Sequence, residues 1–317
     1  MAMTEYFVQG CHMLLVLLLA PLLTGWVRWV KARLLRRRGP SPLQPYRDLV
    51  KLLRKDVVLA DSASWLFRAA PYLVFAALWV AAALVPTFAG GLPFMWAADL
   101  IAIVALLGTA RFFLALAGLD VGTSFGGIGS SREMMIASLA EPAMLMMVFT
   151  LSLLAGTTEL SSVARFMLTA AVGLRVSLAL ALLALTIVAI AENARIPVDN
   201  PATHLELTMV HEAMVLEYSG RHLALIELGA SLKLLLYLSL IACIFAPWGM
   251  AGACAGLKAY LFGGMVYAAK LAFGGLLLAL FETSIAKMRV FRVDQFLGAA
   301  LMLGLLGALL LFVSRSL

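Results

Sequence analysis

Long apolar segments make up most of this chain, and each is long enough to cross a lipid bilayer. A membrane-spanning helix needs about 20 predominantly apolar residues, and eight segments of this kind can be placed along the sequence. They lie near residues 10–30, 69–88, 99–118, 135–155, 169–191, 223–247, 257–281 and 296–313. Because a backbone inside hydrocarbon must satisfy its own hydrogen bonds, each segment is predicted to be an α-helix.

The composition excludes a soluble globular domain. Hydrophobic residues account for 63% of the chain and charged residues for 13%, with a mean hydropathy of +1.01. We therefore expect an all-α integral membrane protein, a single polytopic domain over residues 1–317. The sequence shows no basic-aromatic groove and no recognition helix for nucleic acid. We therefore attribute the net charge of +7 to the orientation of the chain in the membrane and to contact with the lipid surface.

The cysteines exclude a metal centre built by this chain alone. Cys11, Cys243 and Cys254 lie far apart, in or beside apolar segments, and form no CxxC motif. Four thiolates are usual for an iron–sulfur cluster, and a structural zinc also needs a complete ligand set. We expect no metal and no other cofactor to be bound by this chain alone.

The distribution of lysine and arginine predicts the orientation. The first segment lacks a basic region before it and is followed by the cluster Arg28 to Arg38, so it is expected to remain as a transmembrane helix. Most basic residues lie in the loops after the first, third, fifth and seventh segments. By the positive-inside rule these loops face the cytoplasm, and both termini lie outside.

The first cytoplasmic loop, residues 31–68, is predicted to contain an amphipathic helix. Apolar residues from Leu43 to Leu53 recur with helical spacing between charged ones. Two interpretations remain open: a helix anchored on the lipid surface, or a docking surface for a cytoplasmic partner subunit. The docking candidates are Arg36, Arg37, Arg38, Gln44, Arg47, Asp48 and Lys51.

A glycine-rich stretch separates the third and fourth spans, at residues 119–133. A phosphate-binding loop is excluded, because no Gly-Lys-Ser/Thr follows and no strand precedes it. We expect a tight re-entrant turn that brings Asp120, Arg132 and Glu133 to the membrane face, as further docking candidates.

An acidic stretch from Glu192 to Gly220 contains unusually many titratable groups for this chain. Such density at the edge of hydrocarbon indicates a functional site. A zinc-protease helix is excluded, because Val215 stands where the second histidine is required after His211 and Glu212. The candidates for a proton path here are Glu192, Asp199, His204, Glu206, His211, Glu212 and Glu217, and Arg195 is a docking candidate. The alternative is a hydrated helix that faces another subunit.

Several charged residues also interrupt the apolar segments themselves. Glu141 precedes Pro142 in the fourth span, and Lys233 lies in the sixth; Arg111, Arg175 and Lys270 are comparable cases. A single such residue could extend its charged group to the membrane surface. Several charged residues, both acidic and basic, instead favour a polar path through the bundle. Glu141 and Lys233 are therefore added to the proton path.

Motifs along almost the whole chain resemble the complex I subunit 1 family. They are residues 37–40 (RRGP), 43–45 (LQP), 49–52 (LVKL), 192–199 (ENARIPVD), 206–207 (EL) and 217–220 (EYSG). Residues 47–53, 67–72, 111–120, 131–133, 141–142, 231–233 and 281–286 resemble more specifically the membrane anchor subunits of group 4 [NiFe] hydrogenases of the formate hydrogenlyase and hydrogenase 4 type.

This resemblance implies a non-catalytic membrane subunit of a multisubunit oxidoreductase in the bacterial or archaeal cytoplasmic (inner) membrane. Partners would be the hydrogenase large and small subunits, carrying [NiFe] and [4Fe-4S] centres, and antiporter-like membrane subunits. By position, Glu141 matches a span-four glutamate of the family's proton path. The chain would dock the electron-transfer arm and couple it to proton or Na⁺ translocation.

Two alternatives remain open: a quinone-chamber subunit of a proton-pumping NADH:quinone oxidoreductase, and a passive membrane anchor. Ala202 and His204 replace glutamates of the quinone-type pattern, and Val198 replaces its phenylalanine. These differences argue against bound quinone.

Overall fold

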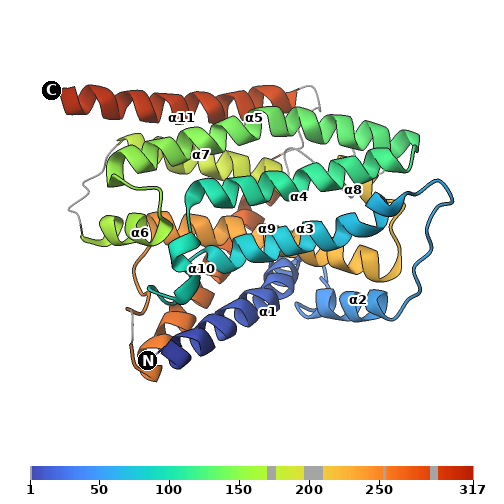
Figure 1. Ribbon diagram of the computed structural model, residues 1–317, viewed down its shortest axis with the longest axis horizontal. Coiled ribbons are helices and arrows are strands. Elements are labelled where there is room, and N and C mark those ends of the chain that lie inside the picture. Colours follow the sequence, from blue (N-terminus) through green and yellow to red (C-terminus); the bar gives the residue numbers. More distant parts are fainter. Residues whose placement is uncertain (1, 170–175, 196–209, 253–254, 286–291, 317) are drawn as a thin grey trace.

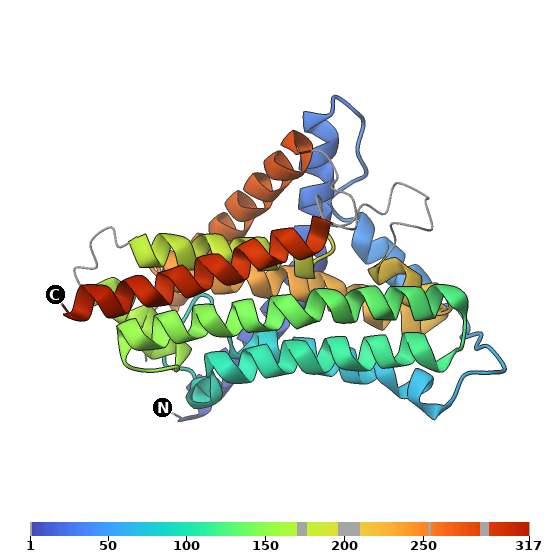
Figure 2. The same ribbon diagram turned by 90° about the horizontal axis from the view of Figure 1, so that it is seen from above.

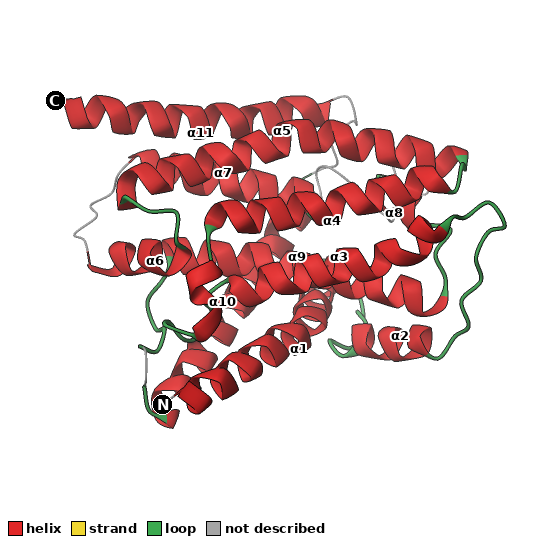
Figure 3. Ribbon diagram, viewed as in Figure 1, coloured by secondary structure: helices red, strands yellow, loops and turns green. Residues whose placement is uncertain are grey.

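The computed structural model describes residues 2–169, 176–195, 210–252, 255–285 and 292–316. Seven helices within these ranges are long and apolar enough to cross a membrane: α1 (Ala2–Leu34), α3 (Trp65–Leu84), α4 (Leu100–Asp120), α5 (Ser124–Ala155), α9 (Gly220–Phe245), α10 (Leu257–Ser284) and α11 (Val293–Ser316). A shorter apolar helix, α7 (Val176–Glu192), is the described part of the predicted fifth span. The helices are joined by loops and short helical turns (Figure 3), and the predicted all-α membrane fold is confirmed.

Most of the long helices run side by side in one bundle. Helix α5 packs against α4, α7 and α11, and α3 packs between α4 and α9 (Figure 1). Helices α1 and α10 form a pair that leans away from the rest of the bundle (Figure 2). Within this pair, the indole N–H of Trp26 donates to the Ala272 carbonyl at 3.1 Å.

The two ends of the bundle differ in what they carry. Both chain termini lie at one end, here called the terminal end, together with α6 (Leu160–Thr169) and the short 3₁₀ helix η1 (Pro93–Ala97) (Figure 1). Helices α2 (Gln44–Leu53) and α8 (His211–Val215) lie at the opposite end, here called the site end. The described parts of the acidic stretch, residues 192–195 and 210–220, therefore lie at the same end as the long basic loop, as predicted from their charges.

The amphipathic helix predicted in the first long loop is present as α2. Pro45 lies in its first turn and is buried, whereas Arg47 and Lys51 are exposed. Gly25 of α1 permits a close approach here, because a Cβ at this position would overlap the Pro42 carbonyl just before α2. Helix α2 thus packs on α1 and α9 with its charged face outward.

The expected re-entrant turn after the third span is wrong. Helix α4 ends at Asp120 and α5 begins at Ser124, so only a tight connection separates two antiparallel helices. Thr123 caps α5 by accepting from the Gly126 amide at 3.2 Å, and the Ser130 hydroxyl donates to the Ala115 carbonyl at 2.8 Å. The glycines serve the close packing of α4 against α5, since a Cβ on Gly126 would overlap the Gly118 carbonyl.

Candidate functional site

A buried arginine in the middle of the bundle is surrounded by carboxylates. The side chain of Arg111 on α4 is only 4% exposed. Its Nη1 lies 3.0 Å from Oε1 of Glu141, its Nε lies 3.6 Å from Oε1 of Glu133, and its Nη2 contacts Glu192. Glu133 and Glu141 are two turns apart on α5 and so lie on the same helix face. Two helices, α5 and α7 (Val176–Glu192), therefore place three carboxylates at one guanidinium of α4.

Glu192 connects this group to a fourth helix. Its side chain is 1% exposed, and its Oε2 lies 2.9 Å from Nζ of Lys233 on α9. We call Arg111, Glu133, Glu141, Glu192 and Lys233 the Arg111 cluster. With all five groups ionised it carries one net negative charge. Glu141 is the most exposed of the five, with 44% of its side chain accessible.

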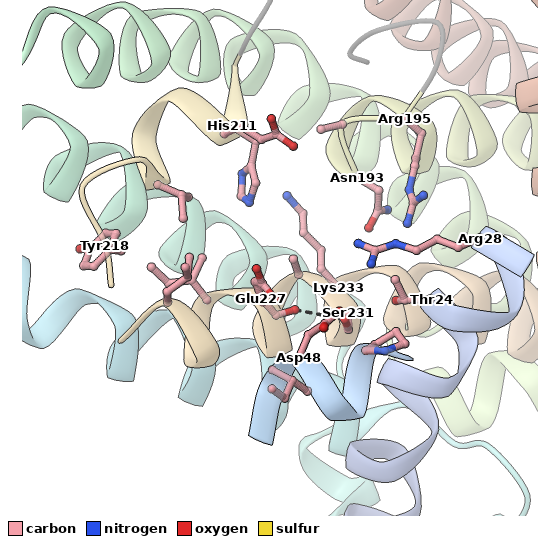
Figure 4. A pocket seen from close by; sticks show the side chains of 18 of the residues that line it. Thr24, Arg28, Asp48, Asn193, Arg195, His211, Tyr218, Glu227, Ser231 and Lys233 are labelled. Carbon is pink, nitrogen blue, oxygen red and sulfur yellow. Dashed lines mark hydrogen bonds between the residues drawn. The ribbon is translucent and has the colours of Figure 1, made fainter. Parts of the chain in front are cut away.

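A cavity of about 450 Å³ opens beside this cluster at the site end. It is lined by α1, α2, α8, α9 and the residues just after α7, and Lys233 and His211 both project into it (Figure 4). Glu192 and Lys233 belong to the cavity lining as well as to the Arg111 cluster. The cavity is thus in direct contact with the buried carboxylate of Glu192.

His211 is held neutral in this cavity. Burial, followed by the neighbouring Lys233 ammonium, lowers the pKa of His211 from its ordinary value to about 4, and Glu192 opposes this shift. At neutral pH the imidazole can therefore accept a hydrogen bond at one ring nitrogen and donate one from the other.

A second group of charges lies on another side of the cavity. Glu282 of α10 is buried, with Oε2 2.7 Å from Nζ of Lys31 and Oε1 3.4 Å from Nη1 of Arg195. Arg28 lines the cavity beside Arg195 (Figure 4). Burial lowers the pKa of the Arg195 guanidinium, Arg28 adds to the effect, and Glu282 opposes it. Glu282 thus connects α1, α10 and the start of the acidic stretch.

The predicted proton-path residues separate into four groups. Glu141, Glu192 and Lys233 are brought together in the Arg111 cluster, and His211 and Glu212 line the adjoining cavity. Glu217 is exposed and does not line this cavity. Asp199, His204 and Glu206 lie outside the described residues.

The predicted docking residues also divide. Arg36, Arg37, Arg38, Arg47 and Lys51 are exposed at the site end. Gln44 donates to Asp48 at 2.8 Å, and Asp48 lines the cavity. Arg132 is half-buried.

Three docking candidates have internal contacts instead. Asp120 accepts from the Ser64 backbone amide at 2.9 Å, next to the start of α3. Arg195 pairs with Glu282. Glu133 is buried against Arg111, so the expectation that it lies on the docking face is wrong. Its place on α5, one helix turn before Ala137 on the buried side, turns it into the bundle.

Sequence reasoning left three important residues out of the site. Arg111, Arg28 and Glu282 all contribute charge to the cluster or the cavity. The available signal was an ionisable residue inside or at the end of a long apolar run, which Arg111 and Glu282 both show.

Comparison with known proteins is consistent with this architecture. Formate hydrogenlyase subunit 4 of Escherichia coli (strain K12) is 36% identical over 87% of this chain and 89% of its own. Hydrogenase-4 component C of the same organism is 38% identical over 75% of this chain and 74% of its own. One chain in a structure of the membrane-bound sulfane sulfur reductase, an archaeal respiratory membrane complex, has the same fold, with a TM-score of 0.81 at 18% identity over 97% of this chain and 99% of that one.

The fold and the site define a polytopic membrane protein with a buried carboxylate–guanidinium cluster next to a polar cavity. A sequence model of the NADH dehydrogenase family matches residues 8–314, almost the entire chain. The chain belongs to this family, and the resemblance to complex I subunit 1 and to group 4 hydrogenase subunits is confirmed.

Proposed function

We propose that this protein is the membrane subunit of a hydrogenase-4 or formate hydrogenlyase-type complex in a bacterial or archaeal cytoplasmic membrane. In this function it holds a cytoplasmic electron-transfer arm and couples electron transfer to proton or Na⁺ movement. The observation that carries the proposal is the continuity between the site-end cavity and the Arg111 cluster, through Glu192 and Lys233. The two E. coli relatives support the type of complex.

The arrangement is suited to transferring protons inward from the cavity. Neutral His211 and the Lys233 ammonium both reach the cavity, and Lys233 contacts Glu192. Protonation of Glu192 removes the charge that holds Lys233 and Arg111 in place, which weakens both ion pairs. Glu141 and Glu133 then become the remaining carboxylates for Arg111. A change at the cavity is in this way transmitted to Glu141 on α5.

The exposed basic surface at the site end supports docking of the arm. Arg36, Arg37 and Arg38 follow α1, and Arg47 and Lys51 project from α2. The partner subunits would carry the [NiFe] and [4Fe-4S] centres, and antiporter-like membrane subunits would complete the complex. Because α2 also lines the cavity, movement of the docked arm would act directly on the cavity wall.

Replacement of Glu141 tests the coupling. In the intact complex, Glu141→Gln should abolish proton movement that accompanies hydrogen evolution, while assembly survives. Glu159→Gln is the matched control, because Glu159 lies at the terminal end and accepts from the Ser162 hydroxyl at 2.6 Å. Unchanged coupling in Glu141→Gln would contradict the proposal and favour a passive anchor.

The cavity itself favours one alternative function. Its volume of about 450 Å³ is within the range of small-molecule sites, about 300–1,000 Å³, so a quinone-reducing complex is the second candidate. Extraction of the purified complex distinguishes the two functions. Nickel–iron subunits with hydrogen evolution support the hydrogenase type, and flavin-bearing subunits with bound quinone support the alternative.

A further inference from the structure

Three buried polar side chains lie near the terminal end of the bundle, away from the Arg111 cluster. Gln9 and His12 are three residues apart on α1, on one helix face, and are 2% and 0% exposed. The edge of the His12 ring faces Phe88, with centroids 5.8 Å apart. Thr87, which is 5% exposed, immediately precedes Phe88. We call Gln9, His12 and Thr87 the Gln9 cluster.

None of the polar atoms of the Gln9 cluster has a hydrogen-bond partner among the described protein groups. These atoms are the amide nitrogen and oxygen of Gln9, both ring nitrogens of His12 and the hydroxyl of Thr87. The Val85 backbone lies near the His12 ring, but without the geometry of a hydrogen bond. A buried polar group without a partner is destabilising, so this concentration of such groups points to a bound ligand.

The chemistry of these groups selects the ligand. Gln9 offers two N–H donors and a carbonyl acceptor, neutral His12 offers one donor and one acceptor, and the Thr87 hydroxyl offers both. A cation would leave the N–H donors of Gln9 without a partner, and an anion would leave the acceptors without one. Water both donates and accepts, and internal water commonly satisfies buried polar groups of this kind.

The surrounding structure encloses the site. The Phe88 ring also meets the Tyr260 ring of α10, with centroids 6.4 Å apart. The Phe88 carbonyl accepts from the Ala251 amide at 2.8 Å, and the Gly90 amide donates to the Ala251 carbonyl at 2.9 Å. The loop after α3, which contains Thr87 and Phe88, is therefore fixed against the loop after α9.

A pair of buried hydroxyls lies between the two polar clusters. Ser239 of α9 and Tyr267 of α10 are 2.7 Å apart, and each is 2% exposed. At 1.5 Å per residue, Ser239 is about 9 Å along α9 from Lys233. Tyr267 is one turn along α10 from Gly263, where a Cβ would overlap the Phe88 carbonyl. Polar groups thus follow one another from the Arg111 cluster toward the terminal end.

We propose that the Gln9 cluster binds internal water and passes protons between the Ser239–Tyr267 pair and the terminal end of the bundle. In this role a ring nitrogen of His12 accepts a proton from one water molecule, and the other ring nitrogen releases a proton to the next. Only the bonds to the transferred protons form and break, and all other covalent bonds stay unchanged. The relay rests on the proposed function, since it requires that protons move through this subunit.

Water in the site is tested by an electron cryomicroscopy map of the intact complex in which ordered water is visible. The expected result is water density in hydrogen-bond contact with Gln9, His12 and Thr87. A map in which these side chains bond directly to protein groups, with no water between them, would overturn the proposal. This measurement does not depend on whether the complex pumps protons.

The relay is tested by proton movement during hydrogen evolution in reconstituted vesicles. Thr87→Val keeps the side-chain shape, and His12→Leu removes the imidazole; both should lose proton movement while hydrogen evolution with a collapsed gradient persists. Thr186→Val is the matched control, because that hydroxyl bonds only within its own helix, to the Leu182 carbonyl at 2.8 Å.

The two proposals fail in different ways. If Glu141→Gln abolishes proton movement while Thr87→Val and His12→Leu both retain it, only the relay is overturned. If Glu141→Gln leaves proton movement intact, the proposed coupling function itself is overturned.

Discussion

Glu192 and Lys233 are joined across the interface of α7 and α9, with 2.9 Å between Oε2 and Nζ, and the other carboxylate oxygen of Glu192 contacts Arg111. A single buried carboxylate therefore contacts one cation inside the bundle and one at the cavity. Its protonation state affects both places at once.

Glu192→Gln should destabilise the bundle. Removal of one partner from a buried ion pair costs about 3–5 kcal/mol, because the remaining charge is left without compensation. Thermal unfolding of the purified complex measures the effect, with exposed Glu217→Gln as the control. Equal unfolding temperatures for the two variants would show that Glu192 carries no structural charge pairing.

Lys31 and Glu282 should be energetically coupled. Their ion pair of 2.7 Å connects α1 to α10, the helix pair that leans away from the bundle. Lys31→Met and Glu282→Gln should each lower stability, and the double variant should lose less than the sum of the two. Contacting charged residues typically show coupling of about 0.5–3 kcal/mol in a double-mutant cycle. Strictly additive losses would mean that the pair contributes nothing.

His211 should make stability depend on pH in the acidic range. Its pKa in the folded protein is about 4, against 6.5 for an ordinary histidine. The unfolded state therefore binds more protons between these values, so stability should fall as pH decreases from about 6.5 toward 4. The slope from this one group is at most about 1.4 kcal/mol per pH unit. His211→Gln should unfold with a shallower pH dependence over this window, and an unchanged slope would contradict the assignment.

Charge reversal of the exposed arginines after α1 should separate docking from lipid anchoring. Arg36→Glu, Arg37→Glu and Arg38→Glu combined should leave the subunit in the membrane but reduce the amount of cytoplasmic arm that copurifies. Lys258→Glu, exposed at the start of α10 near the terminal end, is the control. Full copurification in the triple variant would support the lipid-anchor interpretation of this region.

Much of the architecture could be predicted from local pattern. Hydrophobic segments of about 20 residues correspond to the observed long helices, and the spacing of apolar residues from Leu43 to Leu53 predicted α2. The charges of Glu141, Glu192 and Lys233 were also visible as exceptions within apolar surroundings. Each of these inferences depends only on residues that are near one another in the sequence.

The glycine-rich stretch shows where local pattern was insufficient. Its polar composition resembles a surface turn, so Glu133 was expected on the docking face. The glycines instead permit α4 and α5 to pack closely, and the continuous helix turns Glu133 toward Arg111. The rotation of α5 about its axis determines whether Glu133 lies on the docking face or inside the bundle, and composition does not specify that rotation.

The hydropathy of each segment is thus sufficient to predict a transmembrane helix. The reason is that the cost of exposing polar backbone to lipid applies to each segment separately. The partners of Arg111 were decided only by tertiary structure. Glu141 and Glu192 are 30 and 81 residues away along the chain, and the packing of α4 against α5 and α7 brings them to one guanidinium. The same is true of Gln9, His12 and Thr87, whose shared burial depends on where α1 meets the loop after α3. Ion pairs form between charged groups that are close in space, and that distance is set by the packing of helices that are remote in sequence.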